Sequence, residues 1–271
     1  MKNTRELLEL RELVLQAVAC GRDLFLSHYN EKNTFHLKKE RDPVSVVDVE
    51  IEKTIRAFLG SHCPEIPVIG EELGAAGAHD RSVYWVVDPI DGTVNYLSRI
   101  PLCGISIALV ENGIPVLGCV DFPVLNQRYT GGKGLRPDLN GEFIPPPCAS
   151  LELSQCIVAL GDYSTGKGSR QKNERKVQLQ QLLADQVYRV RMVGSAALDL
   201  CWTASGQFGA SITLSNKPWD MAAGVAILRA CGITVCDMDG TDYTTSSRCV
   251  IACRQPDIAR NLCETISSIL R

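Results

Sequence analysis

The chain has 271 residues, and its 28 basic and 31 acidic residues give a formal net charge of −3. This balance provides no broad basic surface, so nucleic acid and anionic lipid are not expected as partners. With 45% hydrophobic and 22% charged residues, the composition is that of a globular protein with one large or two small domains. No apolar run is long enough to cross a membrane, and the charged first residues lack the apolar stretch of a secretion signal, so we expect a cytoplasmic protein without a membrane partner.

The twelve cysteines are scattered along the chain, and most lie in apolar runs. An even number permits disulfides, but a long chain without a secretion signal favours reduced thiols. Free cysteine packs as a small hydrophobic residue, so we expect these thiols to be mostly buried and unpaired. No Cys-x-x-Cys pair occurs, which argues against a structural zinc site.

The first half of the chain predicts helices followed by an antiparallel sheet. Apolar residues recur at helical spacing over residues 4–29, and a second helix is expected over 46–60, ending at Gly60. Short β-like runs follow, and an Asn-Gly turn between the last two predicts a hairpin. These runs cover residues 66–70, 83–88, 104–113 and 115–123.

The proline-rich segment 142–150 is the predicted linker, because three consecutive prolines fit neither a helix nor a central strand. We therefore expect two units, residues 1–147 and 148–271. Beyond the linker, strands and helices alternate, which is typical of an α/β unit. The predicted strands cover 156–161, 188–194, 210–215, 234–238 and 249–254. The predicted helices cover 170–187, 195–206, 219–232 and 256–270.

The densest group of chemically active residues is Asp-Pro-Ile-Asp-Gly-Thr at 88–93. Asp88 ends a predicted strand, and Asp91 follows beyond the rigid bend of Pro89. Two carboxylates at such a junction suit a hard cation such as Mg²⁺, and backbone N–H groups at the next turn suit phosphate. The alternative is an ordinary turn, since Asp, Pro and Gly are all turn residues.

Further acids stand at comparable places in the sequence. Glu71 and Glu72 directly follow the strand predicted at 66–70, whereas Asp48 and Asp220 lie near predicted helix starts. Each has an ordinary explanation when taken alone: a solvated loop for the glutamates and a helix cap for the aspartates.

Taken together, Gly-Glu-Glu at 70–72, Asp-Pro-Ile-Asp-Gly-Thr at 88–93 and Trp-Asp-Met-Ala-Ala-Gly at 219–224 resemble the motifs of the inositol monophosphatase superfamily, in the same order. The resemblance covers nearly the whole chain. It implies a lithium-sensitive, Mg²⁺-dependent phosphatase with a layered α-β-α-β-α fold of the α/β class and an active site between the two halves. It also implies a small-molecule phosphate ester as substrate and a homodimer.

The resemblance assigns roles to individual residues. Two or three Mg²⁺ ions would be held by Glu71, Asp88, the Ile90 carbonyl, Asp91 and Asp220. Glu71 and Thr93 would orient the attacking water, with Asp48 paired to Thr93. The backbone N–H groups of Gly92 and Thr93 would hold phosphate oxygens. Divalent ions activate the water and neutralise the leaving oxygen, so no side-chain nucleophile is needed.

Substrate choice depends on Thr213, which stands seven residues before Asp220. Inositol-specific members of the superfamily have an acid there that contacts the sugar hydroxyls. A threonine offers no bidentate carboxylate, so the sequence favours a different small sugar or polyol monophosphate. The residues that the resemblance implies as substrate contacts are Asp91, Asp162, Ser164, Gly194, Ser195, Ala196 and Thr213.

Several alternatives stay open at this point. The chain is compatible with an inositol monophosphatase proper, or with a phosphatase for 3′-phosphoadenosine 5′-phosphate or fructose 1,6-bisphosphate. A regulatory binding protein on the same scaffold is the non-enzymatic alternative. Residues 161–168 nearly spell a nucleotide-binding P-loop, but Gly168 stands where the Mg²⁺-binding hydroxyl belongs.

Overall fold

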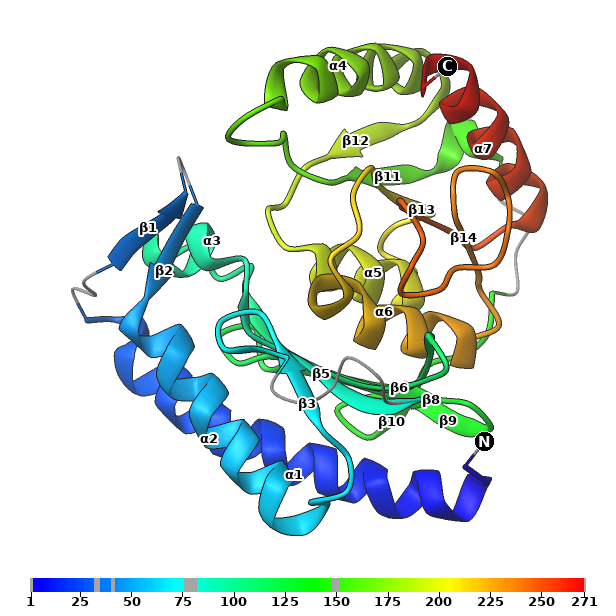
Figure 1. Cartoon of the computed structure of the whole chain (residues 1–271). Helices are drawn as coiled ribbons and strands as arrows, with labels where there is room; N and C mark the ends of the chain where they lie inside the picture. The colour runs from blue at the N-terminus through cyan, green and yellow to red at the C-terminus, as the bar shows by residue number, and fades with distance from the viewer. Residues whose placement is uncertain (1, 32–34, 40–41, 76–81, 148–151, 271) are drawn as a thin grey trace.

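Five layers of secondary structure stack on one another in the computed structural model of the chain, which describes residues 2–31, 35–39, 42–75, 82–147 and 152–270 (Figure 1). From bottom to top of the view, these are a helix pair, an eight-stranded sheet, a second helix pair, a five-stranded sheet and a third helix pair. The predicted α/β class and the α-β-α-β-α layering are confirmed. None of the described helices is long and apolar enough to cross a membrane.

The first layer consists of α1 (Thr4–Tyr29) and α2 (Val46–His62). A capping box closes the N-terminus of each helix and supplies acceptors for the first backbone N–H groups. The apolar faces of both helices share one core with the eight-stranded sheet. Helix α1 has the predicted bounds, whereas α2 continues past Gly60, which was expected to end it. A glycine within a helix costs only about 1 kcal/mol relative to alanine, so this residue alone does not stop the helix.

The eight-stranded sheet has the order β10-β9-β8-β7-β6-β5-β3-β4, and only its β3–β5 pair is parallel. A separate hairpin, β1 (Phe35–Lys39) and β2 (Asp42–Ser45), precedes α2. The strands of the large sheet are β3 (Val68–Gly70), β4 (Gly74–Ala75), β5 (Val83–Asp91), β6 (Gly104–Glu111), β7 (Ile114–Phe122), β8 (Gln127–Gly132), β9 (Leu135–Leu139) and β10 (Glu142–Phe143).

Three of these strands, β8 to β10, lie in a stretch where the sequence predicted none. Gly131 and Gly132 weaken the strand pattern, yet both belong to β8. A Cβ on Gly131 would lie 2.9 Å from the Ile227 Cα of a packed helix, so close packing requires the glycine. The predicted linker 142–150 is also partly wrong, because its first two residues form the edge strand β10. Residues 148–150 of that segment lie outside the described residues.

The central helix pair, α5 (Ala196–Ser205) and α6 (Pro218–Ala230), fills the space between the two sheets (Figure 1). Small residues let α6 approach the large sheet closely. A Cβ placed on Gly118 of β7 would lie 2.2 Å from the Ala223 carbonyl oxygen of α6. The position of α6, and of the Asp220 at its first turn, is therefore set by backbone-to-backbone contact with the sheet.

Replacing Gly118 with alanine is expected to destabilise the protein by about 3 kcal/mol, because the new methyl group displaces α6 from the sheet. Gly60→Ala is the matched control. Nothing lies within 4 Å of the added methyl group at Gly60, and alanine favours the helix by about 0.5–1 kcal/mol. Urea unfolding of the two variants measures both changes. Equal stability of Gly118→Ala and the wild-type protein would show that α6 is not held this way.

The five-stranded sheet has the order β12-β11-β13-β15-β14, with parallel pairing of β11 to both β12 and β13. Helices α4 and α7 cover its outer face, and their apolar side chains form the third core cluster. The elements are β11 (Ile157–Leu160), α4 (Ser169–Gln186), β12 (Arg189–Arg191), β13 (Ala210–Thr213), β14 (Thr234–Cys236), β15 (Val250–Cys253) and α7 (Pro256–Leu270). Two short helices, η1 (Leu153–Gln155) and α3 (Thr93–Leu97), complete the fold.

The predicted state of the cysteines is confirmed for the described part of the chain. Eleven cysteines are described there, none of them is in a disulfide, and all except Cys20 are buried.

Candidate functional site

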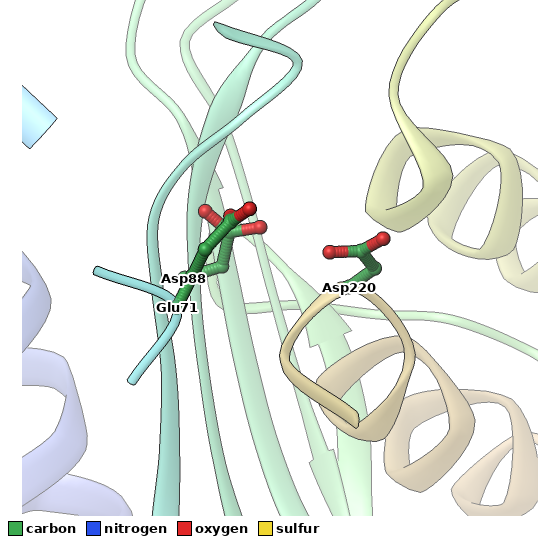
Figure 2. Close-up of side chains that lie close together, drawn as sticks. All are labelled: Glu71, Asp88 and Asp220. Atoms are coloured by element: carbon green, nitrogen blue, oxygen red, sulfur yellow. The ribbon is translucent and has the colours of Figure 1, made fainter. Parts of the chain in front are cut away.

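Three carboxylates from distant parts of the sequence converge at one point (Figure 2). Glu71 follows β3, Asp88 lies in β5, and Asp220 lies in the first turn of α6. One oxygen of each lies within 4.8 Å of the other two. The arrangement follows from the topology, since β3 and β5 are parallel neighbours with Gly70 beside Val87, and α6 packs across the sheet. We call Glu71, Asp88 and Asp220 the carboxylate cluster.

The carboxylate cluster concentrates negative charge in a poorly solvated place. Asp88 is buried, and burial together with the charges of Glu71, Asp91 and Asp220 raises its pKa well above the ordinary value. Burial also raises the pKa of Asp220 to about 8, although the nearby Lys217 acts in the opposite direction. The Lys217 Nζ lies 3.4 Å from a Glu71 carboxylate oxygen.

A divalent cation fits this donor set. Three carboxylates held at one point repel one another, and a hard cation removes that repulsion by binding oxygen from each. The convergence of three acids from distant parts of the sequence, one of them buried, therefore favours a cation site over a group of ordinary turn or loop residues. The helix-cap explanation for Asp220 is wrong, because Lys217 is the N-cap of α6 and Asp220 is the third helical residue.

Strand β5 carries a bulge between Asp88 and Asp91. Asp88 pairs with Ser106 and Asp91 pairs with Gly104, and the register shifts between these pairs. The sequence predicted that the strand ends at Asp88, but β5 resumes pairing at Asp91. Pro89 has no N–H to give to the sheet, and the Ile90 N–H donates to the Asp88 carboxylate at 3.0 Å. The bulge thus separates the environments of the two aspartates.

Asp91 faces α5 and is not among the three carboxylates that cluster. Its carboxylate accepts hydrogen bonds from the Ser195 hydroxyl, the Ala196 N–H at 3.2 Å and the Ala197 N–H at 3.0 Å. Burial raises the pKa of Asp91 to about 6, and these hydrogen bonds partly offset the rise. Ser195 also caps α5 by accepting from the Leu198 N–H. Asp91 therefore fastens the second half of the chain to the first at the edge of the cluster.

The turn after β5 is held against the second half of the chain by a backbone contact. Gly92 has a φ of +86°, and a Cβ there would lie 3.1 Å from the Gly194 carbonyl oxygen. The Asn95 side chain donates to the carbonyls of Leu102 at 2.7 Å and Val193 at 2.8 Å. Both glycines are needed, since Gly194 also has a positive φ, of +79°.

The predicted contact between Thr93 and Asp48 is present. The Thr93 hydroxyl lies 3.3 Å from an Asp48 carboxylate oxygen and 3.2 Å from the Ile90 carbonyl. Asp48 is the third helical residue of α2, and the Ser45 hydroxyl and N–H both donate to it. Asp48 therefore does take part in capping α2, and it does so through one carboxylate oxygen, while the other oxygen accepts from Thr93.

The remaining predicted substrate residues lie at one edge of the five-stranded sheet. Thr213 ends β13, and its side chain packs over Gly161 at the end of β11. Asp162 follows β11 at the same edge. Burial raises the pKa of the neighbouring Asp199, and the charges of Asp91 and Asp162 raise it further. Ser164 lies farther along the loop, where its backbone is bound to the Asn173 side chain at 2.7 and 3.0 Å.

Glu52 of α2 was missed by the sequence analysis. It is fully buried, and its carboxylate accepts from the N–H groups of Glu72 at 2.7 Å and Leu73 at 3.1 Å, and from the Arg56 side chain at 2.7 Å. A Cβ on Gly70 would lie 2.0 Å from the same carboxylate. Glu52 thereby fixes the loop that carries Glu71. The sequence does contain one sign of this role: Glu52 lies on the apolar face of α2, and a charged residue on such a face requires a buried partner.

A cavity of about 460 Å³ lies away from this site. It lies at the other end of α6, where Val116, Leu135 and Arg229 are among its lining residues. None of the predicted site residues lines it. The candidate site is therefore identified by the chemistry of the carboxylate cluster and not by the size of a cavity.

Comparisons with known proteins show what the whole chain resembles. The chain matches the sequence profile of the inositol monophosphatase family over residues 6–271. It is 35% identical over 232 residues to the probable inositol 1-monophosphatase ImpA of Mycobacterium tuberculosis, covering 86% of this chain and 84% of that protein. It is 32% identical over 237 residues to the fructose-1,6-bisphosphatase/inositol-1-monophosphatase of Aquifex aeolicus, covering 86% of each. The solved IMPase of Thermotoga maritima superposes with a TM-score of 0.85 at 25% identity, over 96% of this chain and 97% of that one.

Proposed function

Because the chain belongs to the inositol monophosphatase family, we propose that it is a Mg²⁺-dependent phosphatase that releases phosphate from a small sugar or polyol monophosphate. The observation that carries this proposal is the convergence of Glu71, Asp88 and Asp220 at one point. The names of the relatives, which are phosphatases of inositol phosphate or fructose bisphosphate, support the reaction. They do not support a substrate other than inositol 1-phosphate, since both names include inositol-1-monophosphatase, and that choice rests on Thr213.

The carboxylate cluster would hold the cation, with the Ile90 carbonyl and Asp91 as further oxygen donors beside it. When bound, divalent cations polarise the phosphate ester, lower the pKa of water and neutralise the leaving oxygen. The N–H groups of Gly92 and Thr93, at the first turn of α3, would donate to the phosphate oxygens.

Thr93 and Asp48 would orient the attacking water. The Thr93 hydroxyl donates a hydrogen bond to Asp48, so its oxygen would accept a hydrogen bond from the attacking water, which keeps that proton. Glu71 would accept the second water proton from its position at the end of β3. This oxygen would attack phosphorus in line with the ester oxygen, and the bond between phosphorus and the ester oxygen would break. The ester oxygen would take a proton from solvent and leave as an alcohol, phosphate would be released, and Glu71 would return its proton to solvent. Asp48 keeps its orientation because Ser45 holds its other carboxylate oxygen.

The sugar or polyol part would lie toward α5 and the edge formed by Thr213 and Asp162. The Ser195 and Ala196 groups that bind Asp91 lie on this side, at the first turn of α5. Thr213 can exchange one hydrogen bond with a substrate hydroxyl, whereas a carboxylate can accept two from a diol. This difference underlies the preference for a substrate other than inositol monophosphate.

A substrate panel tests the proposal. Phosphate release is measured with Mg²⁺ for several aldose and polyol phosphates, inositol 1-phosphate, fructose 1,6-bisphosphate and adenosine 3′,5′-bisphosphate. We expect kcat/KM for one sugar or polyol monophosphate to exceed that for inositol 1-phosphate at least about tenfold, a difference of about 1.4 kcal/mol. A preference for inositol 1-phosphate would overturn the substrate assignment and leave the reaction intact. Absence of release from every compound would contradict the reaction itself.

Glu52→Gln is expected to raise the half-saturating Mg²⁺ concentration about tenfold, with kcat at saturating Mg²⁺ little changed. The glutamine loses the charge that pairs with Arg56, and its NH₂ group faces a backbone N–H of the 72–73 loop. Glu71 is then held less firmly. Glu50→Gln, an exposed position on the same helix, is the matched control. Mg²⁺ titration of phosphate release measures both, and identical titration curves would show that Glu52 does not position Glu71.

A further inference from the structure

Two cysteines of the second half lie sulfur to sulfur without being bonded. Cys236 ends β14, and Cys263 lies in α7, the helix that covers the outer face of the five-stranded sheet (Figure 1). Their Sγ atoms are 3.5 Å apart, although the residues are 27 positions apart in sequence. Both residues are almost completely buried, with 4% and 7% exposure. The two thiols therefore face each other across the contact between a strand and a helix.

The surroundings distinguish these two thiols from the other buried cysteines. The hydrogen bond between the two thiols lowers the pKa of Cys263, whereas burial raises the pKa of Cys253 to about 12. The next sulfur in this region, Cys249, donates instead to the Asp237 carboxylate at 3.2 Å. Cys236 and Cys263 are thus the two thiols placed to react with each other.

We infer that Cys236 and Cys263 form an oxidative modification site, at which hydrogen peroxide produces an intrachain disulfide. A disulfide requires sulfur atoms about 2.0 Å apart, so the two sulfurs have to approach by about 1.5 Å. Rotation of the two side chains provides such an approach, because the sulfurs already lie in contact. This site lies outside the carboxylate cluster and does not depend on the proposed phosphatase activity.

The reaction balances with peroxide as the only co-reactant. The Cys263 thiolate attacks one peroxide oxygen, an S–O bond forms, the O–O bond breaks, and the departing hydroxide takes the proton that Cys263 released. The Cys236 sulfur then attacks the Cys263 sulfur, the S–S bond forms, the S–O bond breaks, and the second hydroxide takes the Cys236 proton. Two thiols and one peroxide give one disulfide and two waters. The thiol pair loses the two electrons that peroxide gains.

The disulfide would fasten α7 to the sheet. Helix α7 is held there by apolar side chains such as Ile258, Leu262 and Ile266. A covalent link closes the loop that contains β15 and reduces the entropy of the unfolded chain. The oxidised protein should therefore unfold at a temperature several degrees above that of the reduced protein.

Peptide mapping of the full chain tests this inference. The protein is treated with hydrogen peroxide or with dithiothreitol, its free thiols are alkylated in denaturant, and the non-reduced digest is analysed by mass spectrometry. We expect one cross-linked product that joins the Cys236 and Cys263 peptides and is two hydrogens lighter than their sum. Dithiothreitol should abolish it. Recovery of both cysteines alkylated after peroxide, or a cross-link through another cysteine, would overturn the inference.

Variants add a second readout. Cys263→Ser should remove the cross-linked product and the rise in unfolding temperature after peroxide. Cys249→Ala removes the neighbouring thiol and should keep both. If Cys263→Ser does not fold, the map of the wild-type chain still decides the question, since it needs no substitution. Loss of the Cys236–Cys263 cross-link in Cys249→Ala would show that the reaction requires the Cys249 thiol, and would contradict a reaction of these two thiols alone.

Discussion

Asp88→Asn is expected to lower kcat/KM for phosphate release at least about a thousandfold, a loss of about 4 kcal/mol of transition-state stabilisation. Asp88 is the most deeply buried member of the carboxylate cluster. Asparagine keeps its size and its acceptor for the Ile90 N–H, but it brings no negative charge to a cation. The variant should fold normally, because the change removes one of three mutually repelling charges.

The same substitution should raise stability when no metal is bound. In EDTA, urea unfolding is expected to show Asp88→Asn at least as stable as the wild-type protein, whereas phosphate release is almost lost. Asp185→Asn, at an exposed position on α4, is the control for removing one negative charge and should change neither property. Turnover of Asp88→Asn close to that of the wild-type protein at saturating Mg²⁺ would refute the metal-binding role.

The metal-free protein is expected to lose stability as the pH rises from about 4 to about 8. Burial raises the pKa of Asp91 to about 6 and that of Asp220 to about 8, both above the ordinary value of 3.8. The folded chain therefore binds more protons than the unfolded chain in this range, and stability present at low pH disappears as these groups ionise. The shift of Asp91 alone corresponds to about 3 kcal/mol. Asp237, whose pKa is lowered, titrates below this window.

Mg²⁺ should reverse this loss at high pH, because a bound cation stabilises the ionised carboxylates. Urea midpoints measured across the pH range in EDTA and in Mg²⁺ test the prediction. Asp220→Asn should flatten the EDTA profile above pH 7, since it removes the group that titrates at about 8. Stability that rises with pH in EDTA, or the absence of a Mg²⁺ effect at pH 8.5, would contradict this account.

Local sequence patterns predicted the elements that depend on local chemistry. The helix at 4–29 has apolar residues at a regular spacing, and its observed bounds are the predicted ones. Strand β8 was missed because Gly131 and Gly132 lack the side chains that mark a strand. Position 131 has to be glycine because α6 packs directly against its backbone. The requirement comes from a helix some ninety residues away in sequence, so no local pattern expresses it.

In the candidate site, too, the sequence predicted what depends on local chemistry and missed what depends on distant parts of the chain. Glu71 and Asp88 could be placed at strand ends from the sequence, but their meeting depends on the parallel pairing of β3 and β5. Asp220 joins them only because α6 packs across the sheet, so the resemblance to a known family, rather than spacing, brought it into the prediction. Asp91 was expected beside Asp88, yet the bulge in β5 directs it to α5. Glu52 was missed because its partners are backbone N–H groups twenty residues away.

The most direct test of the central claim is the position of a bound metal ion. Crystals grown with Mn²⁺, which takes the same oxygen ligands as Mg²⁺ and gives an anomalous signal, should show an anomalous peak between the carboxylates of Glu71, Asp88 and Asp220. We expect oxygen atoms of all three residues to coordinate the ion at that peak. An anomalous map without a peak at the carboxylate cluster, from crystals soaked at millimolar Mn²⁺, would contradict it.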